Sequence, residues 1–583
     1  MAVIKKPLQK TFLMNVLWDI QKKRRFISRD DMTKIAEEFD ISRMELEGVI
    51  SFYHFFHRTH SGKYTIYLNK SVVSSHKNYK LVKKAFENEV GVKFGNVTDN
   101  KMFGLFVAPC IGLSDQESSA LINFNAFTDL TPKKVKIIIS KLKKGESLDS
   151  FSKLPKNNIQ YIPDVDRTIF FKKYSPGIAL KKLKKISPDQ VIDLVKKSNL
   201  AGRGGAFFPT GLKWQYCKNN KSDQKYIICN ADEGEPGTFK DRVLMNKLPG
   251  LLIEGMTMAA YAVGATKGAI YLRAEYFYLK EKLENKIEEF KAKGLLGKDI
   301  LGIKNFDFDI YIHMGAGAYI CGEETALISS MEGKRGEPTI KEFFPVEKGF
   351  LGKPTIVNNV ETLCAVPRIF EMGVEKWLSL GTEKTPGTKL LSVSGDCKKP
   401  GVYEIEWGMK VSDLLKMIGA ENPKMVQFSG PSGYCLSKED FNRSIRGEDL
   451  ICCGSVMVFN KDRDILDILK CYSDFFVSES CGICVPCRVG NYLLNKKLKK
   501  LILGHADQID LKAIKDWGNI IKRTSRCGLG QTSSNSLLCA MEKFSDDFQK
   551  RLTGDGDINK AFNIDNAIKE YDTIIDEIET TYG

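Results

Sequence analysis

Long apolar runs are missing from this chain of 583 residues. Its most apolar window, residues 251–272, is interrupted by Glu254 and Lys267. A membrane-spanning helix needs about 20 uninterrupted apolar residues, so no direct membrane span is expected. The first residues also lack an apolar stretch followed by small residues, so no signal peptide is expected.

Cysteine and histidine are both scarce. Fifteen cysteines are too few for a secreted disulfide scaffold of this length, and three of them lie within seven residues, as in cytosolic metal or redox sites. A reducing cytoplasm is therefore the predicted location. Of the six histidines, His54, His57 and His60 recur among aromatic residues. We interpret these three as a helix end beside an aromatic core, with a metal site as the alternative.

Acidic residues are scarce in the first third of the chain. Residues 1–200 carry 36 basic and 20 acidic side chains, whereas the remaining residues carry 52 of each. Such asymmetry is typical of a surface for nucleic acid or for an acidic partner. No helix-turn-helix, zinc-finger or RNA-binding aromatic pattern accompanies it, so no nucleic acid is expected and a nucleic-acid-binding protein is a remote alternative. A docking surface for an acidic partner fits best, with a solvated lysine-rich face as the alternative.

The composition and periodicity indicate a multidomain protein of class α/β plus α. With 43% apolar and 27% charged residues the chain is neither disordered nor collagen-like, and its length favours about three to five domains. The predicted parts are residues 1–62 (helical), 63–147 (a small α/β unit), 148–179 (a linker), 180–385 (a larger α/β block), 386–463 (short strands with one helix) and 464–583 (helical).

Three polar loops in the larger α/β block combine glycines with acids or amides. Gly202, Gly204 and Gly205 let backbone amides approach a phosphate or a flat ring, and Lys213 adds a positive charge. This loop is neither a Walker sequence nor a dinucleotide fingerprint, and alone it is as often structural as ligand-binding. Carboxylates follow the strand-like residues 226–228, and glycines, acids and paired amides recur between residues 315 and 362. The carboxylates could equally cap a helix, but three such loops together predict a large nucleotide-type ligand.

A cysteine motif lies near the C-terminus. Cys481, Cys484 and Cys487 recur every three residues, and Cys527 follows forty residues after the last of them. Three thiolates at this spacing and a remote fourth predict a 4Fe–4S cluster. Structural zinc, which takes its ligands as separated pairs, and unbound reduced cysteines are the alternatives.

Together these motifs resemble the flavin-bearing, NADH-oxidising subunit of respiratory complex I and its relatives, which include the diaphorase subunits of NAD-reducing hydrogenases and NAD-dependent formate dehydrogenases. The resemblance covers about residues 180–545. It implies a Rossmann-like FMN and NAD(H) domain at 180–385, a ubiquitin-like insert of SLBB type at 386–463, and a helical 4Fe–4S domain at 464–583. This chain departs from the family at Phe207, where the family usually has glycine.

The resemblance also implies the roles of individual residues. No side chain is assigned a catalytic role, because the cofactors carry out the hydride transfer. The implied FMN contacts are Gly202, Arg203, Gly204, Lys213, Asn230, Asp232, Gly322, Glu323, Asn358, Asn359 and Thr362. The implied NAD(H) contacts are Phe208, Glu233, Glu235, Tyr319, Glu324, Lys341 and Phe344, and the implied 4Fe–4S ligands are Cys481, Cys484, Cys487 and Cys527.

Residues 1–146 resemble the family's partner subunit, in which helices precede a thioredoxin-like domain, here fused into the same chain. That subunit holds a 2Fe–2S cluster on four cysteines, and the matching positions here are Lys70, Ser75, Cys110 and Ser114. One thiol does not hold such a cluster, so we expect the domain at 63–147 to carry no 2Fe–2S cluster.

The fused arrangement resembles most the large diaphorase subunit of NAD-reducing nickel–iron hydrogenases. It implies hydride exchange between NAD(H) and FMN, then single electrons through the 4Fe–4S cluster to or from a partner subunit. The implied partners are an iron–sulfur electron-transfer subunit and a catalytic module, either hydrogenase or formate dehydrogenase. A formate dehydrogenase diaphorase subunit and a fused complex I subunit are the alternatives. Glu235 and Glu324 should repel a 2′-phosphate and favour NAD(H) over NADP(H).

Overall fold

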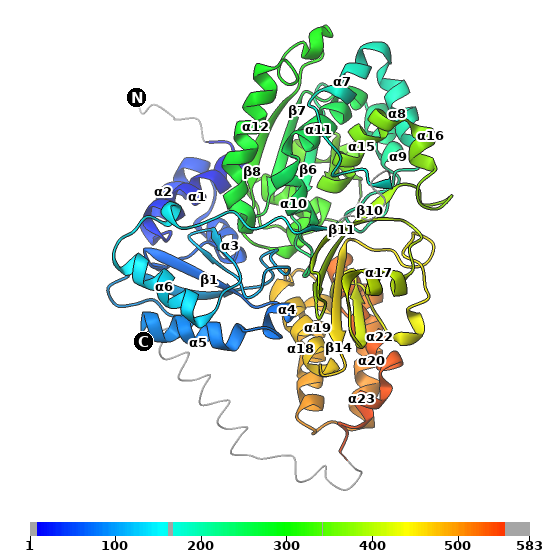
Figure 1. Cartoon of the computed structure of the whole chain (residues 1–583). Helices are drawn as coiled ribbons and strands as arrows, with labels where there is room; N and C mark the ends of the chain where they lie inside the picture. The colour runs from blue at the N-terminus through cyan, green and yellow to red at the C-terminus, as the bar shows by residue number, and fades with distance from the viewer. Residues whose placement is uncertain (1–7, 161–166, 341, 554–583) are drawn as a thin grey trace.

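The computed structural model of the chain describes residues 8–160, 167–340 and 342–553. Three β-sheets and a set of C-terminal helices form a mixed α/β structure of several parts (Figure 1). In this view one sheet lies in the upper lobe, one in the left lobe and one at the lower right, beside the C-terminal helices. The predicted class, α/β plus α, is confirmed at this coarse level.

Two of the three helices that begin the left lobe start at serines. Ser28 and Ser42 precede the second and third helices and accept hydrogen bonds from N–H groups of the first turn. A sheet of order β2-β1-β3-β4 follows, with β1 parallel to β2 and antiparallel to β3. The elements are α1 (Leu13–Arg24), α2 (Arg29–Phe39), α3 (Arg43–Phe52), β1 (Tyr64–Asn69), α4 (Val72–Ser75), α5 (Tyr79–Val90), β2 (Phe103–Ala108), β3 (Ala120–Ile122), β4 (Asn125–Phe127) and α6 (Pro132–Lys143).

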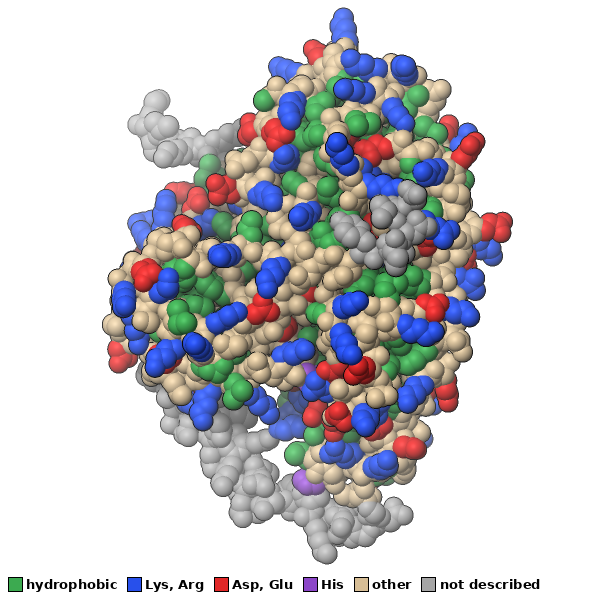
Figure 2. Space-filling model, viewed as in Figure 1, with side chains coloured by type: hydrophobic (Ala, Val, Ile, Leu, Met, Phe, Trp, Pro, Cys, Tyr) green, Lys and Arg blue, Asp and Glu red, His purple; other side chains and the backbone are tan. Residues whose placement is uncertain are grey.

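Lysine and arginine are frequent on the surface of the left lobe. Figure 2 shows their side chains spread over the lobe that contains α5 and α6, with fewer acidic side chains among them. Part of the basic surplus of the first third is therefore exposed on this face.

The upper lobe holds four parallel strands in the order β8-β7-β6-β9. Their carboxyl ends meet at one edge, and the strand order reverses beside β6, which is where open α/β sheets bind ligands. The elements are α7 (Ile178–Lys181), α8 (Pro188–Lys197), α9 (Thr210–Asn219), β6 (Tyr226–Ala231), α10 (Lys240–Lys247), α11 (Pro249–Val263), β7 (Lys267–Leu272), α12 (Lys280–Ala292), β8 (Asp309–Met314), α13 (Glu324–Met331), α14 (Pro345–Lys348), β9 (Thr355–Asn359), α15 (Val360–Met372) and α16 (Val374–Leu378).

The third sheet has the order β13-β12-β14-β10-β11-β5. Its edge strand β5 comes from the segment predicted as a linker, and the Glu404 carboxylate accepts hydrogen bonds from the N–H groups of Ile169 and Phe170. That segment is thus packed on the sheet where the structure describes it. The elements are β5 (Ile159–Gln160), β10 (Thr388–Gly395), β11 (Gly401–Glu406), α17 (Val411–Ile418), β12 (Pro423–Phe428), β13 (Tyr434–Leu436) and β14 (Ser455–Asn460).

The C-terminal part is helical up to the end of the described residues. Apolar side chains of its helices form a core with Met425 and Phe459 of the third sheet, so the two parts pack directly together. The helices are α18 (Ile465–Glu479), α19 (Val485–Ile502), α20 (Gln508–Thr524), α21 (Gly528–Thr532), α22 (Asn535–Lys543) and α23 (Ser545–Gln549).

Candidate functional site

The carboxyl ends of β6 and β9 bring four predicted residues together. The side-chain amide of Asn230, at the end of β6, donates a hydrogen bond to the carbonyl of Gly322 at 2.8 Å. Asn230 also lies opposite Asn359 in the parallel ladder. The Asn358 amide oxygen accepts from the Trp214 indole at 2.9 Å. Loops far apart in the predicted block therefore form one polar site at the edge of the sheet.

The glycine loop at residues 202–205 lies against this edge. A Cβ on Gly204 would lie 3.1 Å from the Cβ of Asn359, so glycine is what allows the close approach. The backbone N–H of Arg203 donates to Thr362 Oγ1 at 2.9 Å. The Arg203 side chain turns instead toward Trp377 and Trp407, with its guanidinium 5.1 Å from the second ring. The backbone of Arg203 thus contacts Thr362 of α15, while its guanidinium lies beside the two tryptophans.

Phe207 adopts the backbone shape that the family's glycine would suit. Its φ is +56°, in the left-handed region that a bulky side chain rarely adopts. The ring packs edge-on against Trp407 at 5.8 Å and joins the core of the third sheet. The loop therefore keeps its turn despite the phenylalanine, and the ring points away from the polar edge.

Glu233 anchors the start of α10. Its carboxylate accepts from the N–H groups of Asp241 and Arg242 and from the Tyr276 hydroxyl at 2.9 Å. Burial raises the pKa of Glu233 to about 7, because the charged form has lost its water. These hydrogen bonds occupy the carboxylate oxygens in holding α10 and Tyr276. The predicted contact of Glu233 with NAD(H) would compete with them.

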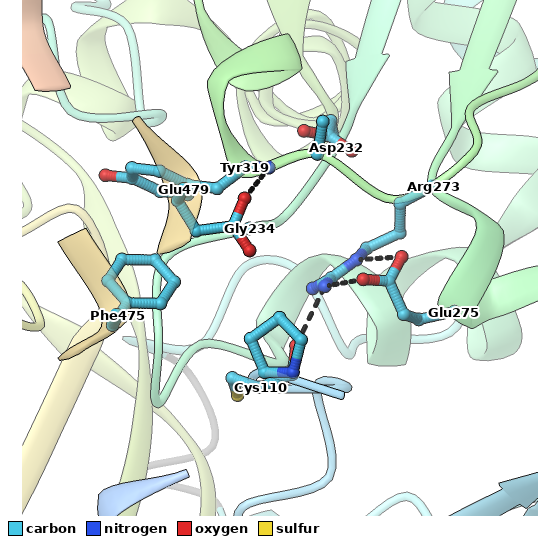
Figure 3. Close-up of a pocket in the computed structure, with 10 residues that line it drawn as sticks. Cys110, Asp232, Gly234, Arg273, Glu275, Tyr319, Phe475 and Glu479 are labelled. Carbon is cyan, nitrogen blue, oxygen red and sulfur yellow. Dashed lines mark hydrogen bonds and ion pairs between the residues drawn. The ribbon is translucent and has the colours of Figure 1, made fainter. Parts of the chain in front are cut away.

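Asp232 is a buried carboxylate without a full set of partners. One of its oxygens, Oδ2, is buried and has no hydrogen-bond partner among the described residues, and burial raises the pKa of Asp232 well above its usual range. It lines a small cavity with Arg273 and Tyr319 (Figure 3). A buried acceptor without a donor costs about 1–3 kcal/mol unless a ligand or water supplies one. This oxygen is therefore a candidate position for a hydrogen-bonding ligand or a water molecule.

Arg273, a residue outside the sequence motifs, closes the other wall of this cavity. It makes a two-pronged ion pair with Glu275, at 3.0 and 2.6 Å, and donates to the carbonyl of Cys110 at 2.8 Å (Figure 3). Glu479, at the end of α18, accepts from the Tyr319 N–H at 2.9 Å and from His54 at 3.0 Å. No role was assigned to Arg273 or Glu479 from the sequence. The signals that could have found them are that Arg273 directly follows β7 and that Glu479 is the last residue of a helix.

Glu235 and Tyr319 form a second polar group. The Tyr319 hydroxyl donates to Glu235 at 2.5 Å, and Ser432 binds the same carboxylate through its N–H at 3.0 Å and its hydroxyl at 2.6 Å. Burial raises the pKa of Glu235. The Tyr319 ring packs against Phe475 at 4.9 Å. Residues of the upper lobe, the third sheet and α18 thus converge here.

Lys213 and the start of α13 complete the polar site. Lys213 Nζ binds Glu324 at 2.8 Å and the carbonyl of Val357 at 2.9 Å. Glu323 caps α13 by accepting from the N–H groups of Thr325 and Ala326. Phe208 and Phe344 are 46% and 57% exposed, so both rings are free to cover a ligand. Lys341 lies outside the described residues.

The four predicted cluster cysteines meet at the ends of α18, α19 and α21. Cys484 precedes α19 and Cys527 precedes α21, and all four thiols border one small apolar cluster with Phe476. Burial and the neighbouring thiols raise the pKa of Cys487 to about 11. In the described ranges, no three His, Cys, Asp or Glu side chains lie close enough to hold a single metal ion, so the four cysteines share one region without forming a closed single-ion site.

Known proteins match both halves of the site. A model of the family described as Nuo51 FMN-binding domain matches residues 195–368, and one described as NADH-ubiquinone oxidoreductase-F iron-sulfur binding region matches residues 467–551. The NAD-reducing hydrogenase HoxS subunit alpha of Cupriavidus necator is 47% identical to the chain, over 98% of this chain and 97% of its own length. The chain belongs to the HoxS alpha family.

Other relatives cover less of the chain or are solved structures. An NADH-quinone oxidoreductase subunit of Aquifex aeolicus is 44% identical over 64% of this chain and 88% of its own length. The crystal structure of an NAD+-reducing NiFe-hydrogenase in the H2-reduced state contains a chain that is 34% identical, with a TM-score of 0.88 and coverage of 93% of this chain and 94% of that one. The predicted resemblance to NADH-oxidising flavin and iron–sulfur subunits is confirmed.

The prediction that the N-terminal domain has no 2Fe–2S cluster is contradicted. A model of the family described as thioredoxin-like 2Fe-2S ferredoxin matches residues 2–143 and points to such a cluster. The prediction counted thiols of one domain, where Cys110 is the one cysteine at the four matching positions. In the fold, Cys471 of α18 lines the same cavity of about 270 Å³ as Cys110 and Lys70. A count restricted to one domain left that second thiol out.

Within the described part of the chain, no helix combines the length and the apolar character needed to cross a membrane.

Proposed function

We propose that this HoxS alpha family member is the diaphorase subunit of an NAD-reducing hydrogenase. It would exchange a hydride between NAD(H) and FMN and pass single electrons through a 4Fe–4S cluster to a partner subunit. The observation that carries the FMN site is the buried Asp232 Oδ2, which lacks a partner among the described residues and lies in the same block as a glycine loop that approaches Asn359. Flavin supplies the conversion between two-electron and one-electron chemistry when it is bound.

The residues at the strand ends fit a flavin nucleotide. Gly202, Gly204 and Gly322 would give backbone access, and Asn230, Asn358 and Asn359 are amides positioned at the carboxyl ends of β6 and β9. Asp232 would accept from a ligand hydroxyl or ring N–H. Lys213 would face an anionic group, although Glu324 already neutralises part of its charge. Arg203 would contribute its backbone rather than its guanidinium.

The NAD(H) contacts would lie on the open side of the same edge. Phe208 and Phe344 are exposed rings that would cover the nicotinamide and the adenine, while Tyr319 and Glu235 would meet polar groups of the dinucleotide. These groups would hold the nicotinamide against the flavin and exclude water, which is the contribution that positioning makes to the rate.

Cys481, Cys484, Cys487 and Cys527 would hold the 4Fe–4S cluster. Their shared border with Phe476 and Leu529, and the mutual electrostatic influence of their thiols, support one common site. A cluster there would lie close to Tyr319 and Ile320, which border the same apolar group. Electrons would then pass to an iron–sulfur partner and a catalytic hydrogenase module, with the cytoplasm as the proposed location.

The Cys484→Ser variant tests this proposal. We expect lower iron content and loss of electron delivery to the partner, with flavin retained and NADH–ferricyanide activity partly preserved, since flavin reduces some acceptors directly. Iron, flavin and both activities are measured on the same preparation. Cys397→Ser, which changes a half-buried cysteine away from the four, is the control. Unchanged iron in Cys484→Ser would refute the cluster assignment.

Cofactor preference gives a second test. Glu324→Gln removes a negative charge in the first turn of α13, so relative activity with NADPH should rise if that carboxylate repels a 2′-phosphate. The size expected is about tenfold in the ratio of kcat/KM values, as for one unfavourable charge pair. The exposed Glu375 of α16, changed to Gln, is the control. An unaltered ratio in Glu324→Gln counts against this role.

A further inference from the structure

Two cysteines outside the proposed cofactor sites lie against each other between the third sheet and the C-terminal helices. Cys435 is buried in β13, and Cys539 is half-buried in α22. The thiol of Cys539 is 3.2 Å from the carbonyl oxygen of Cys435, and that of Cys435 is 3.7 Å from the carbonyl oxygen of Ser536. These contacts place the two cysteines side by side where β13 and α22 pack together. No step of the proposed reaction uses this pair.

The two thiols differ in reactivity. The neighbouring Cys435 side chain lowers the pKa of Cys539 to about 7, with help from the nearby Lys543 ammonium and against the opposing effects of burial and Asp440. The same contact raises the pKa of Cys435. In the described ranges, burial raises the pKa of other thiols, among them Cys110 and Cys217. A half-buried thiolate beside a second thiol is the arrangement of an oxidation-sensitive cysteine with a resolving partner.

Helix α22 connects this pair to the proposed NAD(H) site. Asn535 and Ser536 lie one turn before Cys539, on the same face of the helix. Asn535 donates to the carbonyl of Ser432 at 3.0 Å, and Ser536 donates to the carbonyl of Pro431 at 2.7 Å. Ser432 in turn holds the Glu235 carboxylate through two hydrogen bonds. A shift of α22 relative to β13 therefore changes the support of Glu235.

We propose that Cys539 and Cys435 form a disulfide on exposure to a hydroperoxide, and that this bond weakens NAD(H) binding by moving Ser432. The effect on NAD(H) binding rests on the proposed function, whereas the formation of the disulfide does not. In the reaction, the Cys539 sulfur attacks one peroxide oxygen, the O–O bond breaks, and hydroxide leaves as Cys539 becomes a sulfenic acid. The Cys435 sulfur then attacks the Cys539 sulfur, the S–O bond breaks, and the Cys435 proton leaves with the oxygen as water. The hydroxide takes up the proton that the Cys539 thiol released on ionising, so two thiols lose two electrons and one hydrogen peroxide becomes two waters.

Closing the bond requires the two segments to move closer. A disulfide holds its sulfurs about 2.05 Å apart, much closer than two sulfurs in contact without a bond. β13 is the edge strand of its sheet and is held by its pairing with β12, so we expect α22 to move toward it. Its motion carries Asn535 and Ser536 with it.

The test uses the full-length protein with its cofactors, treated with hydrogen peroxide and digested without reductant. Mass spectrometry should find a peptide that joins residues 435 and 539, two hydrogens lighter than its parts, and dithiothreitol should remove it. In Cys435→Ser, Cys539 should stop at the sulfenic acid and be captured by dimedone. Cys397→Ser should cross-link as the wild type does. A wild-type digest without the 435–539 peptide overturns the proposal.

Kinetic measurements then test separately whether the disulfide weakens NADH binding. After cross-linking, KM for NADH should rise by about tenfold, the effect expected from losing a hydrogen bond to a charged group, with kcat for ferricyanide reduction little changed. The Cys539→Ser variant should keep its KM after the same treatment. Complete cross-linking with an unchanged KM overturns the link to Ser432. Absence of NADH oxidation before any treatment would instead refute the proposed function and leave the cross-linking result intact.

Discussion

Glu361, fully buried at the start of α15, accepts a hydrogen bond from Lys389 and lies 3.0 Å from Lys240 Nζ. The two ammonium groups outweigh burial, so the pKa of Glu361 is lowered. Asp232 belongs to the same block, yet its Oδ2 is buried and has no partner in the described part of the chain. Glu361 is thus a structural carboxylate with its charge compensated, whereas Asp232 keeps an oxygen that a ligand or a water molecule can satisfy.

At the scale of single residues, His54 and Glu479 give a prediction about pH. Burial disfavours the charged form of both groups, but the attraction between the two charges is stronger. The pKa of His54 is therefore raised and that of Glu479 is lowered. The histidine's contribution to stability is complete below its unfolded pKa of 6.5 and is lost as pH rises through its raised folded pKa. The glutamate's contribution is complete above 4.5 and is lost as pH falls through its lowered pKa.

We therefore expect His54→Gln to cost most stability between pH 4.5 and 6.5 and little at alkaline pH. The loss should be about 0.5–1 kcal/mol, since the imidazole is partly exposed and solvent screens the pair. Denaturant unfolding followed across this pH range measures it. His505, an exposed histidine, changed to Gln should show no such pH dependence. A loss that stays constant from acid to alkaline pH contradicts the ion pair.

At the scale of elements, α10 attaches the upper lobe to the left lobe. Its Arg242 is fully buried, binds Asp115 at 3.1 Å, and donates to the carbonyls of Gly112 and Lys156. The start of the same helix is held by Glu233 of the strand-end loop. One short helix therefore ties the position of that loop to the left lobe.

Arg242→Met should be strongly destabilising for this reason. It leaves the Asp115 carboxylate buried without its cation, which costs about 3–5 kcal/mol in comparable cases. The free energy of unfolding from denaturant titration measures the effect. Lys247→Met, on the exposed side of α10, should change it by less than about 0.5 kcal/mol. If Arg242→Met and Lys247→Met lose similar stability, the pair does not hold the lobes together.

The elements that carry the site follow from local sequence, whereas its connections do not. Strands at residues 64–68 and 226–228 and a helix at Val411–Ile418 are predictable from apolar periodicity, and the structure has them. The polar edge of the upper-lobe sheet was also predictable, because loops rich in glycine and acidic residues follow the predicted strands. Arg273 and Glu479 were missed because their partners lie far away in sequence, and such pairing has no local pattern.

At the scale of the whole molecule, one apolar core crosses the predicted domain boundaries. It contains Leu17 and Trp18 of α1 together with Leu251 of α11 and Ile270 of β7. Trp18 also donates a hydrogen bond from its indole to the carbonyl of Gly315 at 3.1 Å. The N-terminal helices thus support the glycine loop that follows β8.

Trp18→Ala should therefore weaken flavin binding as well as stability, although the residue is far from the polar edge in sequence. The lost packing should cost about 3–5 kcal/mol, and the loop at residues 315–317 loses the indole hydrogen bond. Flavin fluorescence released during thermal unfolding, followed together with circular dichroism, should show both signals shifting to lower temperature by the same amount. Phe12→Ala removes a large exposed side chain beside α1 and should shift neither signal. If Trp18→Ala unfolds earlier but releases flavin at the wild-type temperature, the N-terminal helices form an independent unit, and the shared core does not support the flavin site.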